Sequence, residues 1–263
     1  MAEQAAERRQ RGIGVELAGV RKAYGNHEVL RGVDLSVRAG ELLAILGQSG
    51  TGKSVLLRHI IGLEQVDAGR IVVGGIELPR YLALPPGRKP FRMAMVFQNA
   101  ALLASLTVAE NVALRMREHR TDDPQRIAQI VREVLEAVEL GGTEDKYPGE
   151  LSGGMRKRVA IARALAVDPE IILYDEPTAD LDPILTEEIG NLIVRIRKTR
   201  GSTQMIVTHN LLLARAIADR IAVLAEGRIA ECTTPAELVK SRHPLTREFL
   251  RASMLGLEES RPC

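Results

Sequence analysis

The chain has 263 residues, and its 36 Lys and Arg against 34 Asp and Glu leave a formal net charge of +2. That balance excludes a polybasic nucleic-acid-binding protein, and an aromatic content of 3% without tryptophan leaves no platform for base stacking. The two cysteines, Cys232 and Cys263, have no metal-type spacing, which favours incidental thiols in a reducing compartment.

The ends and the hydropathy of the chain favour a protein of the cytosol. Residues 1–12 are charged and polar, and we expect a flexible N-terminal tail rather than a signal peptide. No stretch approaches the roughly 18 uninterrupted apolar residues that a membrane span needs.

Alternating and paired patterns near the N-terminus predict antiparallel strands. Apolar and polar residues alternate at 33–37, and residues 69–78 are expected to form two strands around Gly74-Gly75. These segments predict a small antiparallel layer that flanks the main core.

Four short, continuously apolar segments predict parallel strands that are buried on both faces. These segments are 41–46, 93–97, 171–174 and 205–208. Helical patterns separate them, and the alternation predicts an α/β fold with right-handed crossovers. The clearest helix follows Asp182, which is expected to cap it, with Pro183 in the first turn and Gly201 at its end.

The residues between the first of these strands and the next helix carry the strongest chemical signal. Residues 47–54 read GQSGTGKS, the pattern of a loop whose backbone N–H groups wrap phosphates. Lys53 is expected to reach the β- and γ-phosphates, and the Ser54 hydroxyl to ligate Mg²⁺. The expected nucleotide contacts are Gly47, Gln48, Ser49, Gly50, Thr51, Gly52, Lys53, Ser54 and Val55.

Residues 99–150 show helical patterns and no strand pattern. They predict an all-helical insert. Thr107 with Glu110 fits a capping box, and Asp123-Pro124 is expected to open a helix that ends at Gly141-Gly142. The apolar loop 101–106 either lines a docking groove or forms the buried first turn of the insert.

A second helix start suited to an anion lies at LSGGMRKRVAIARAL, residues 151–165. Ser152 can cap this helix, and Gly153 and Gly154 let backbone N–H groups approach a ligand closely. The basic run 156–158 either steers phosphate or faces solvent on the helix surface, and solvent exposure is the favoured interpretation.

Polar side chains end the predicted parallel strands. Gln98 follows 93–97, Asp175 and Glu176 follow 171–174, and His209 follows 205–208. Ligands of open α/β sheets bind at the carboxyl ends of strands, so these groups are expected near the phosphate loop. Asp175 is expected to hold Mg²⁺, Glu176 to deprotonate the attacking water and His209 to sense the γ-phosphate. Considered alone, His209 is better explained as a structural or surface histidine, and Gln98 as an ordinary glutamine at a strand end.

In this order, the motifs resemble those of ATP-binding-cassette (ABC) ATPases over residues 13–228. The matching elements are Tyr24, the phosphate loop, Gln98, the LSGG signature at 151–154, Asp175-Glu176, the D-loop at 179–183 and His209. The resemblance implies a P-loop NTPase fold of the α/β class. Its parts are a RecA-like parallel-sheet core, an antiparallel β subdomain and a helical subdomain at about 99–152, followed by a C-terminal extension at 229–263.

The same resemblance implies the activity and assigns the site. ATP is expected to be hydrolysed with Mg²⁺, which Ser54, Gln98 and Asp175 hold, while Tyr24 stacks on adenine. The expected catalytic residues are Glu176, His209, Gln98 and Lys53. Two copies are expected to pack head to tail, so that Ser152, Gly153 and Gly154 of one copy complete the ATP site of the other.

Finer features resemble the Mla/Mce-associated branch, whose ATPases drive phospholipid or other lipid movement in the bacterial envelope. They are Met155, where most cassettes carry glutamine, and residues 105–112. This implies permease subunits and lipid-binding envelope subunits as partners, no nucleic acid, and a peripheral position at the cytoplasmic face of the inner membrane. Gln48, Asp180 and Asn210 depart from the family pattern without removing a catalytic group.

Three functions stay open at this point. The first is a lipid-transport ATPase, the second is a cassette that imports or exports another substrate, and the third is a cassette that works in DNA repair or translation. A scaffold that does not hydrolyse ATP is disfavoured by the presence of Glu176 and His209. The tail at 234–263 predicts two short helices broken at His243-Pro244, packed either on their own core or on the partner copy.

Overall fold

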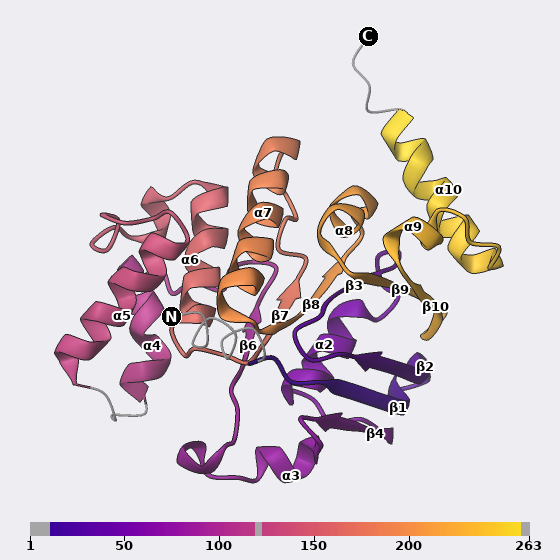
Figure 1. The fold of residues 1–263 in the computed structure, drawn as a ribbon, viewed down its shortest axis with the longest axis horizontal. Helices are drawn as coiled ribbons and strands as arrows, with labels where there is room; N and C mark the ends of the chain where they lie inside the picture. The colour runs from indigo at the N-terminus through magenta and orange to yellow at the C-terminus, as the bar shows by residue number, and fades with distance from the viewer. Residues whose placement is uncertain (1–10, 119–122, 259–263) are drawn as a thin grey trace, which may run out of the picture.

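The computed structural model describes residues 11–118 and 123–258. A parallel sheet carries helices on its surface, a group of helices lies beside it, and a second sheet lies on its other side (Figure 1). Within the described ranges, no helix combines the length and apolar character needed to cross a membrane.

The central sheet has six strands in the order β10-β9-β3-β8-β7-β6, and all neighbours are parallel except β10 and β9. The four strands expected from apolar runs are confirmed as members of this sheet. Its strands are β3 (Leu42–Leu46), β6 (Met93–Val96), β7 (Ile171–Asp175), β8 (Thr203–Thr208), β9 (Arg220–Ala225) and β10 (Arg228–Thr233).

The second sheet is antiparallel with the order β2-β1-β4-β5, as the sequence predicted for this part of the chain. Its strands are β1 (Val15–Tyr24), β2 (His27–Val37), β4 (Ala68–Val73) and β5 (Ile76–Glu77). Val73 pairs with Ile76 around the expected glycine turn. Strand β1 was not expected, because a register shift after Leu17 interrupts the period-two pattern that identifies a strand.

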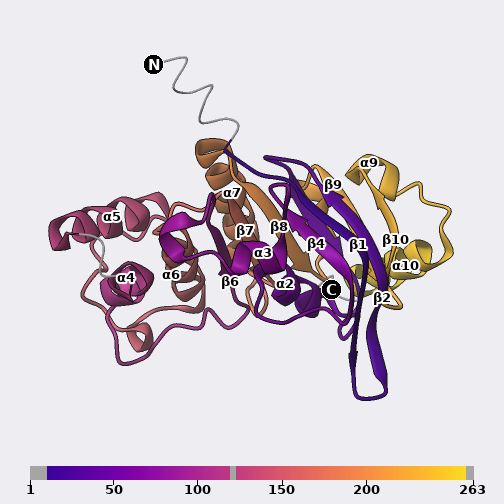
Figure 2. The same cartoon turned by 90° about the horizontal axis from the view of Figure 1, so that it is seen from below.

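Helices cover the parallel sheet on both faces (Figures 1 and 2). They are α2 (Lys53–Ile61), α3 (Leu78–Leu82), α4 (Val108–Glu118), α5 (Pro124–Ala137), α6 (Gly153–Leu165), α7 (Pro183–Arg200), α8 (Leu211–Ile217), α9 (Pro235–Leu238) and α10 (Pro244–Glu258). Short 3₁₀ turns occur at Pro86–Arg88 and Pro148–Glu150. Helices α4 and α5 pack on α6 and form the predicted helical insert.

The core consists of two apolar clusters, one on each face of the parallel sheet. Strand β3 shows this directly, because Leu42, Ala44 and Leu46 belong to one cluster, whereas Leu43 and Ile45 belong to the other. The second cluster also contains the apolar side of α2 and the inner face of the antiparallel sheet. A strand buried on both faces therefore carries the phosphate loop, which fixes the position of that loop.

Several predicted helix ends are confirmed. The Asp182 side chain accepts a hydrogen bond from Leu185 N at 2.9 Å, and Gly201 ends α7 with φ +65°. Thr107 and Glu110 form the reciprocal bonds of a capping box.

The expected end of α5 at Gly141-Gly142 is wrong. The helix ends at Ala137, and Leu140 N instead bonds to Leu135 O at 2.8 Å, with Glu139 between them at φ +62°. An αL residue at Glu139 therefore ends the helix before the glycines are reached.

The C-terminal part forms the two predicted helices, α9 and α10, with the break at His243-Pro244. Phe249 and Leu250 are buried in the chain's own core cluster, so the helix packs on its own subunit. Strand β10 crosses the expected boundary at residue 228, since it pairs with β9 in the central sheet. The division into an ATPase domain and an extension stays a prediction.

Candidate active site

The phosphate loop leaves β3 and enters α2 as the sequence predicted. Glycine is required at Gly47, because a Cβ there would lie 2.5 Å from Leu224 O of strand β9. It is also required at Gly52, which has φ +97° and whose Cβ would lie 2.8 Å from Val29 Cγ1 of β2. The loop is therefore held tightly between the two sheets.

Helix α2 presents backbone donors to this loop. Its first internal hydrogen bond runs from Leu56 N to Gly52 O at 2.8 Å. The N–H groups of Lys53, Ser54 and Val55 precede that bond and are the donors that every helix leaves at its N-terminus. Together with the helix dipole, they make a cradle for an anion.

Lys53 is buried beneath the loop. Its Nζ donates to Gly47 O at 2.8 Å and to Gln48 O at 2.9 Å, and it lies 3.6 Å from Glu176 Oε1. Burial lowers the pKa of Lys53, while the carboxylates of Glu176 and Asp175 oppose that shift. A mobile cation inside the loop can exchange these carbonyl contacts for phosphate oxygens.

Asp175 ends β7 opposite the start of α2, and Ser54 Oγ donates to its Oδ1 at 2.6 Å. Burial raises the pKa of the Asp175 carboxyl, and the hydrogen bond from Ser54 opposes this. A hydroxyl and a carboxylate within contact distance are the oxygen ligands that Mg²⁺ prefers beside nucleotide phosphates. The residues present therefore fit a magnesium ion.

Glu176 is held in an unusual backbone conformation beside these groups, with φ +44°. Its Oε2 lies 3.1 Å from His209 Nδ1, and its Oε1 faces Lys53. The Glu176 side chain is buried, whereas that of His209 is largely exposed. A carboxylate in this position can accept a proton from a water molecule at the mouth of the loop.

The structure thus brings together Lys53, Ser54, Asp175, Glu176 and His209, which come from β3–α2 and from the ends of β7 and β8. It does not bring the Gln98 side chain to them. Gln98 is exposed after β6, and its side chain makes no hydrogen bond with any residue in the described part of the chain.

Tyr24 ends β1 with its ring partly exposed, as an adenine platform requires. Its hydroxyl donates to Glu64, and Lys22 Nζ lies 5.5 Å from the ring centroid. Burial and the bond to Glu64 raise the pKa of Tyr24 to about 12. The ring is therefore held at its hydroxyl end, and Lys22 lies over one of its faces, while part of the ring stays exposed.

The other predicted anion-binding helix start, at Ser152–Gly154, lies at the beginning of α6. Ser152 caps α6 by accepting from Met155 N at 3.2 Å, and Gly154 is buried with a would-be Cβ 3.3 Å from Leu185 Cδ2. Helix α6 packs against α4, α5, α7 and one face of β6, whereas α2 packs against the opposite face of the sheet at β6, β7 and β8 (Figures 1 and 2). The two cradles therefore occupy different parts of one subunit.

The expectation that the basic run 156–158 faces solvent is wrong for two of its members. Lys157 is only 8% exposed, and Arg158 pairs with Glu139 at 2.5 Å and Glu188 at 2.7 Å. A helical signal for the burial of Lys157 existed. It lies three residues after Gly154 and four before Ile161, on the buried face of α6.

The D-loop departure at Asp180 has a structural counterpart. Asp180 adopts φ +64°, which a glycine takes without strain and which aspartate tolerates better than most residues. Replacement of the usual glycine therefore leaves the course of the loop intact.

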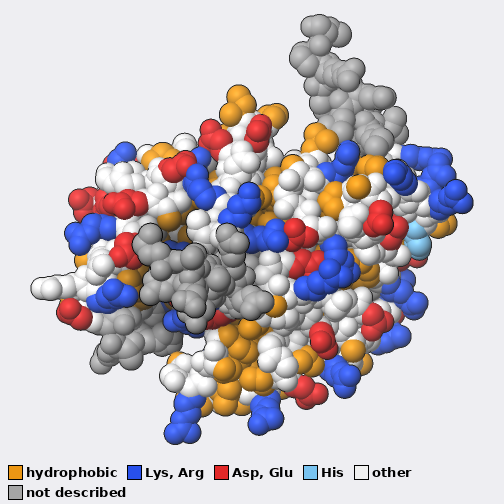
Figure 3. Space-filling view, viewed as in Figure 1, with side chains coloured by type: hydrophobic (Ala, Val, Ile, Leu, Met, Phe, Trp, Pro, Cys, Tyr) orange, Lys and Arg blue, Asp and Glu red, His pale blue; other side chains and the backbone are white. Residues whose placement is uncertain are grey.

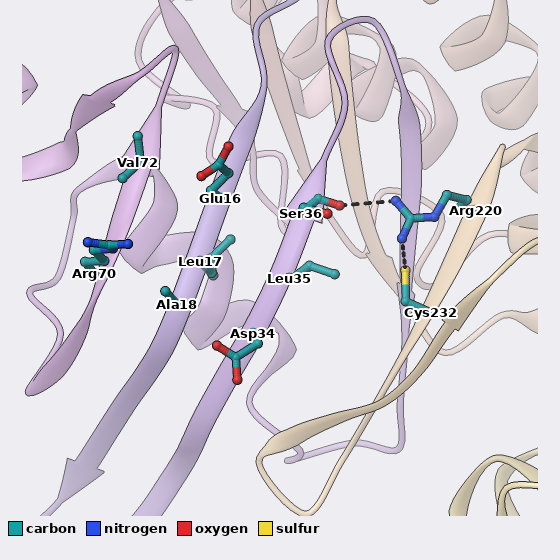
Figure 4. A pocket seen from close by; sticks show the side chains of 10 residues that line it. All are labelled: Glu16, Leu17, Ala18, Asp34, Leu35, Ser36, Arg70, Val72, Arg220 and Cys232. Carbon is teal, nitrogen blue, oxygen red and sulfur yellow. Dashed lines mark hydrogen bonds between the residues drawn. The ribbon is translucent and has the colours of Figure 1, made fainter.

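A hollow of about 430 Å³ lies on the outer face of β1, β2 and β4, remote from the phosphate loop (Figure 4). Its most buried cation, Arg220, already donates to Ser36 O at 3.2 Å and to Cys232 Sγ at 2.9 Å, and it pairs with Glu41 at 3.2 Å. These contacts join the two sheets, so we interpret Arg220 as a structural residue.

Apolar side chains are exposed at the sheet edge that carries the site. Ile184 at the start of α7 is 73% exposed, and Leu212 at the start of α8 is 52% exposed. Figure 3 shows apolar groups near the upper ends of these two helices.

The chain is similar to known proteins over most of its length. The family model described as ABC transporter matches residues 30–179. The probable ribonucleotide transport ATP-binding protein mkl of Mycobacterium leprae is 38% identical over 245 residues, which are 93% of this chain and 71% of that protein. The sulfate/thiosulfate import ATP-binding protein CysA of Xylella fastidiosa is 41% identical over 244 residues, covering 91% of this chain and 69% of that protein.

A solved structure is also similar. It is the dimer of the ATP-binding cassette MJ0796 in a post-hydrolysis state bound to ADP and Pi, with a TM-score of 0.74 and 32% identity. The match covers 84% of this chain and 98% of that one. The expected fold, with its parallel and antiparallel sheets, is confirmed.

Proposed function

This chain belongs to the ABC transporter family as one of its ATP-hydrolysing cassettes, and we propose that it powers the movement of phospholipid or another lipid. It is the ATPase subunit of a membrane transporter, and cassettes of this family work as dimers with membrane permease subunits. The observation that carries the proposed site is the convergence of Lys53, Ser54, Asp175, Glu176 and His209 at one sheet edge.

In the proposed site, the loop 47–55 wraps the phosphates of ATP with its N–H groups. Lys53 leaves the carbonyls of Gly47 and Gln48 and binds the β- and γ-phosphates. Ser54, Asp175 and Gln98 would hold Mg²⁺, which would neutralise charge on the phosphate oxygens.

Glu176 accepts a proton from the attacking water as the water oxygen bonds to the γ-phosphorus. The bond between that phosphorus and the ADP oxygen breaks, and ADP and phosphate leave. His209, 3.1 Å from Glu176, orients the carboxylate and contacts the γ-phosphate. Tyr24 stacks on the adenine, because its ring is fixed and partly exposed at the end of β1.

Two copies pack head to tail, so that Ser152, Gly153 and Gly154 of one chain face the phosphate loop of the other. Two observations support this arrangement. Each subunit holds one phosphate loop and one signature helix in separate places, and Ile184 and Leu212 are exposed at the site edge. Because the phosphate loop of each copy then faces the signature helix of the other, the same contact occurs twice and the pair closes as a two-fold, isologous dimer.

The lipid assignment rests on Met155 and residues 105–112, which resemble the Mla/Mce-associated branch. The names of the relatives include a ribonucleotide transporter and a sulfate importer, so other solutes are the competing candidates. In the proposed assembly, the chain lies at the cytoplasmic face of the inner membrane, held there by its permease.

The experiment is purification of the complex in a mild detergent, followed by lipid analysis and ATPase assays after reconstitution. We expect a multi-span membrane protein to copurify, and phospholipid to stimulate ATP hydrolysis more than ribonucleotide or sulfate does. A complex with Lys53→Ala gives the background rate. Stimulation by one of the other solutes alone would contradict the lipid assignment, and recovery of DNA or ribosomes would contradict the transporter assignment.

A further inference from the structure

The segment that follows β6 has a strained backbone. Ala100 and Ala101 adopt φ +57° and +48°, in the left-handed region that non-glycine residues rarely occupy. Two such residues in succession persist only where the surrounding structure holds them. The segment begins at Gln98, the residue proposed to help hold Mg²⁺.

Two cations of the signature helix α6 hold this segment by its carbonyl oxygens. Lys157 Nζ donates to Gln98 O, and Arg163 donates to Ala100 O through Nη2 and to Ala101 O through Nη1, both at 2.6 Å. We call these two side chains and three carbonyls the carbonyl clamp.

The clamp is costly in electrostatic terms. Lys157 is 8% exposed, and burial lowers the pKa of both Lys157 and Arg163. At Lys157 the negative charges of Asp180 and Glu176 oppose this shift of the pKa, whereas for Arg163 burial is the main cause. Buried charges are retained where their hydrogen bonds compensate the lost hydration, and here the carbonyls of residues 98–101 supply those bonds.

The clamp lies between the two halves of the proposed site. Strand β6 pairs with β7 through Val96 and Tyr174, one residue before Asp175, so the backbone at Gln98 leaves the sheet beside the strand that ends at Asp175. Lys157 lies on the same helix as Ser152, the cap of the signature.

We propose that Lys157 and Arg163 are positioning residues, which fix the backbone at 98–101 and thereby place the Gln98 side chain relative to Asp175. This inference rests on the proposed function, in which Gln98 assists in holding Mg²⁺.

The test begins with Lys157→Met, which keeps the length of the side chain and removes the donor. We expect kcat to fall about 10- to 100-fold, the size typical of lost support for a metal ligand. The Mg²⁺ concentration for half-maximal activity should rise, whereas ATP binding without Mg²⁺ should stay unchanged. Lys157→Arg, which restores a donor, should recover most of the rate.

The matched control is Lys198→Met on the exposed side of α7, which should leave kcat and the Mg²⁺ dependence unchanged. If Lys157→Met is poorly folded, Arg163→Lys serves instead, since it keeps the charge but loses one carbonyl contact. It should also raise the Mg²⁺ requirement. A loss of thermal stability with unaltered Mg²⁺ dependence would overturn the proposal in favour of a purely structural role.

A double-mutant comparison separates this inference from the proposed function. If the clamp acts through Gln98, Lys157→Met should lower kcat no further in a Gln98→Ala background. Independent, multiplying losses would overturn the clamp. A wild-type Mg²⁺ dependence in Gln98→Ala alone would instead contradict the proposed role of Gln98, and an active Lys53→Ala would contradict the proposed phosphate loop.

Discussion

The hydroxyl of Tyr174 is fully buried in β7 and has no hydrogen-bond partner among the residues that the structure describes. Burial raises the pKa of this tyrosine, so the group stays protonated and uncharged. The side chain points into the apolar cluster that contains Val159 and Ile189, one residue before Asp175. Tyr174→Phe removes only the unpaired oxygen and is therefore expected to stabilise the protein.

The magnitude follows from the desolvation of one polar group. An unsatisfied buried hydroxyl costs about 1–3 kcal/mol of stability. In the phenylalanine variant, the small void left by the missing oxygen reduces the gain in stability. We expect a net gain of about 1–2 kcal/mol in the free energy of unfolding. At about 2–4 °C per kcal/mol for a chain of this size, Tm should rise by about 2–8 °C.

The assay is urea denaturation together with calorimetry, and the ATPase rate serves as a check that Asp175 is undisturbed. Tyr81→Phe is the matched control, because Tyr81 is also buried but its hydroxyl donates to Phe91 O at 2.8 Å. The same substitution there should lower stability by about 1 kcal/mol. A destabilised Tyr174→Phe would refute the reasoning and indicate that a water molecule satisfies the hydroxyl.

Three further predictions concern the site. Lys53→Ala should lose ATP binding and hydrolysis together, measured by nucleotide titration and phosphate release, and near-normal turnover would remove Lys53 from the mechanism. Glu176→Gln should lower the rate about 10²- to 10⁴-fold and form an ATP-dependent dimer in gel filtration. Adding Ser152→Arg should abolish that dimer while ATP still binds, and a persisting dimer would contradict the head-to-tail arrangement. Gly52→Ala should lower Tm and ATP affinity, whereas Gly87→Ala, whose Cβ meets nothing within 4 Å, should change neither.

Much of the fold follows from local patterns in the sequence. The strands β3, β6, β7 and β8 are continuously apolar because both of their faces are covered, and such runs can be recognised without a structure. The phosphate loop and the pair Asp175-Glu176 were predictable for the same reason, since each directly follows one of these runs.

The parts that were missed depend on tertiary contacts. Strands β9 and β10 turn through Glu226 and Gly227, both at positive φ, and this Glu-Gly pair is a weaker turn signal than Asn-Gly. The burial of Lys157 could not be inferred from its charge, because its partner is a backbone carbonyl 59 residues away. The residue type of Lys157 does not by itself predict a backbone partner so distant in the sequence.

The central position of β3 has a consequence for the synthesis of the protein. This strand pairs on one side with β8 and on the other with β9, so both of its neighbours come from residues 203–225. Until the ribosome has released those residues, an entirely apolar strand has two open edges, which is a hazard for aggregation. Pairings across such a long stretch of chain also form slowly. The phosphate loop, encoded near the start of the chain, is thus among the last parts of the molecule to acquire its structure.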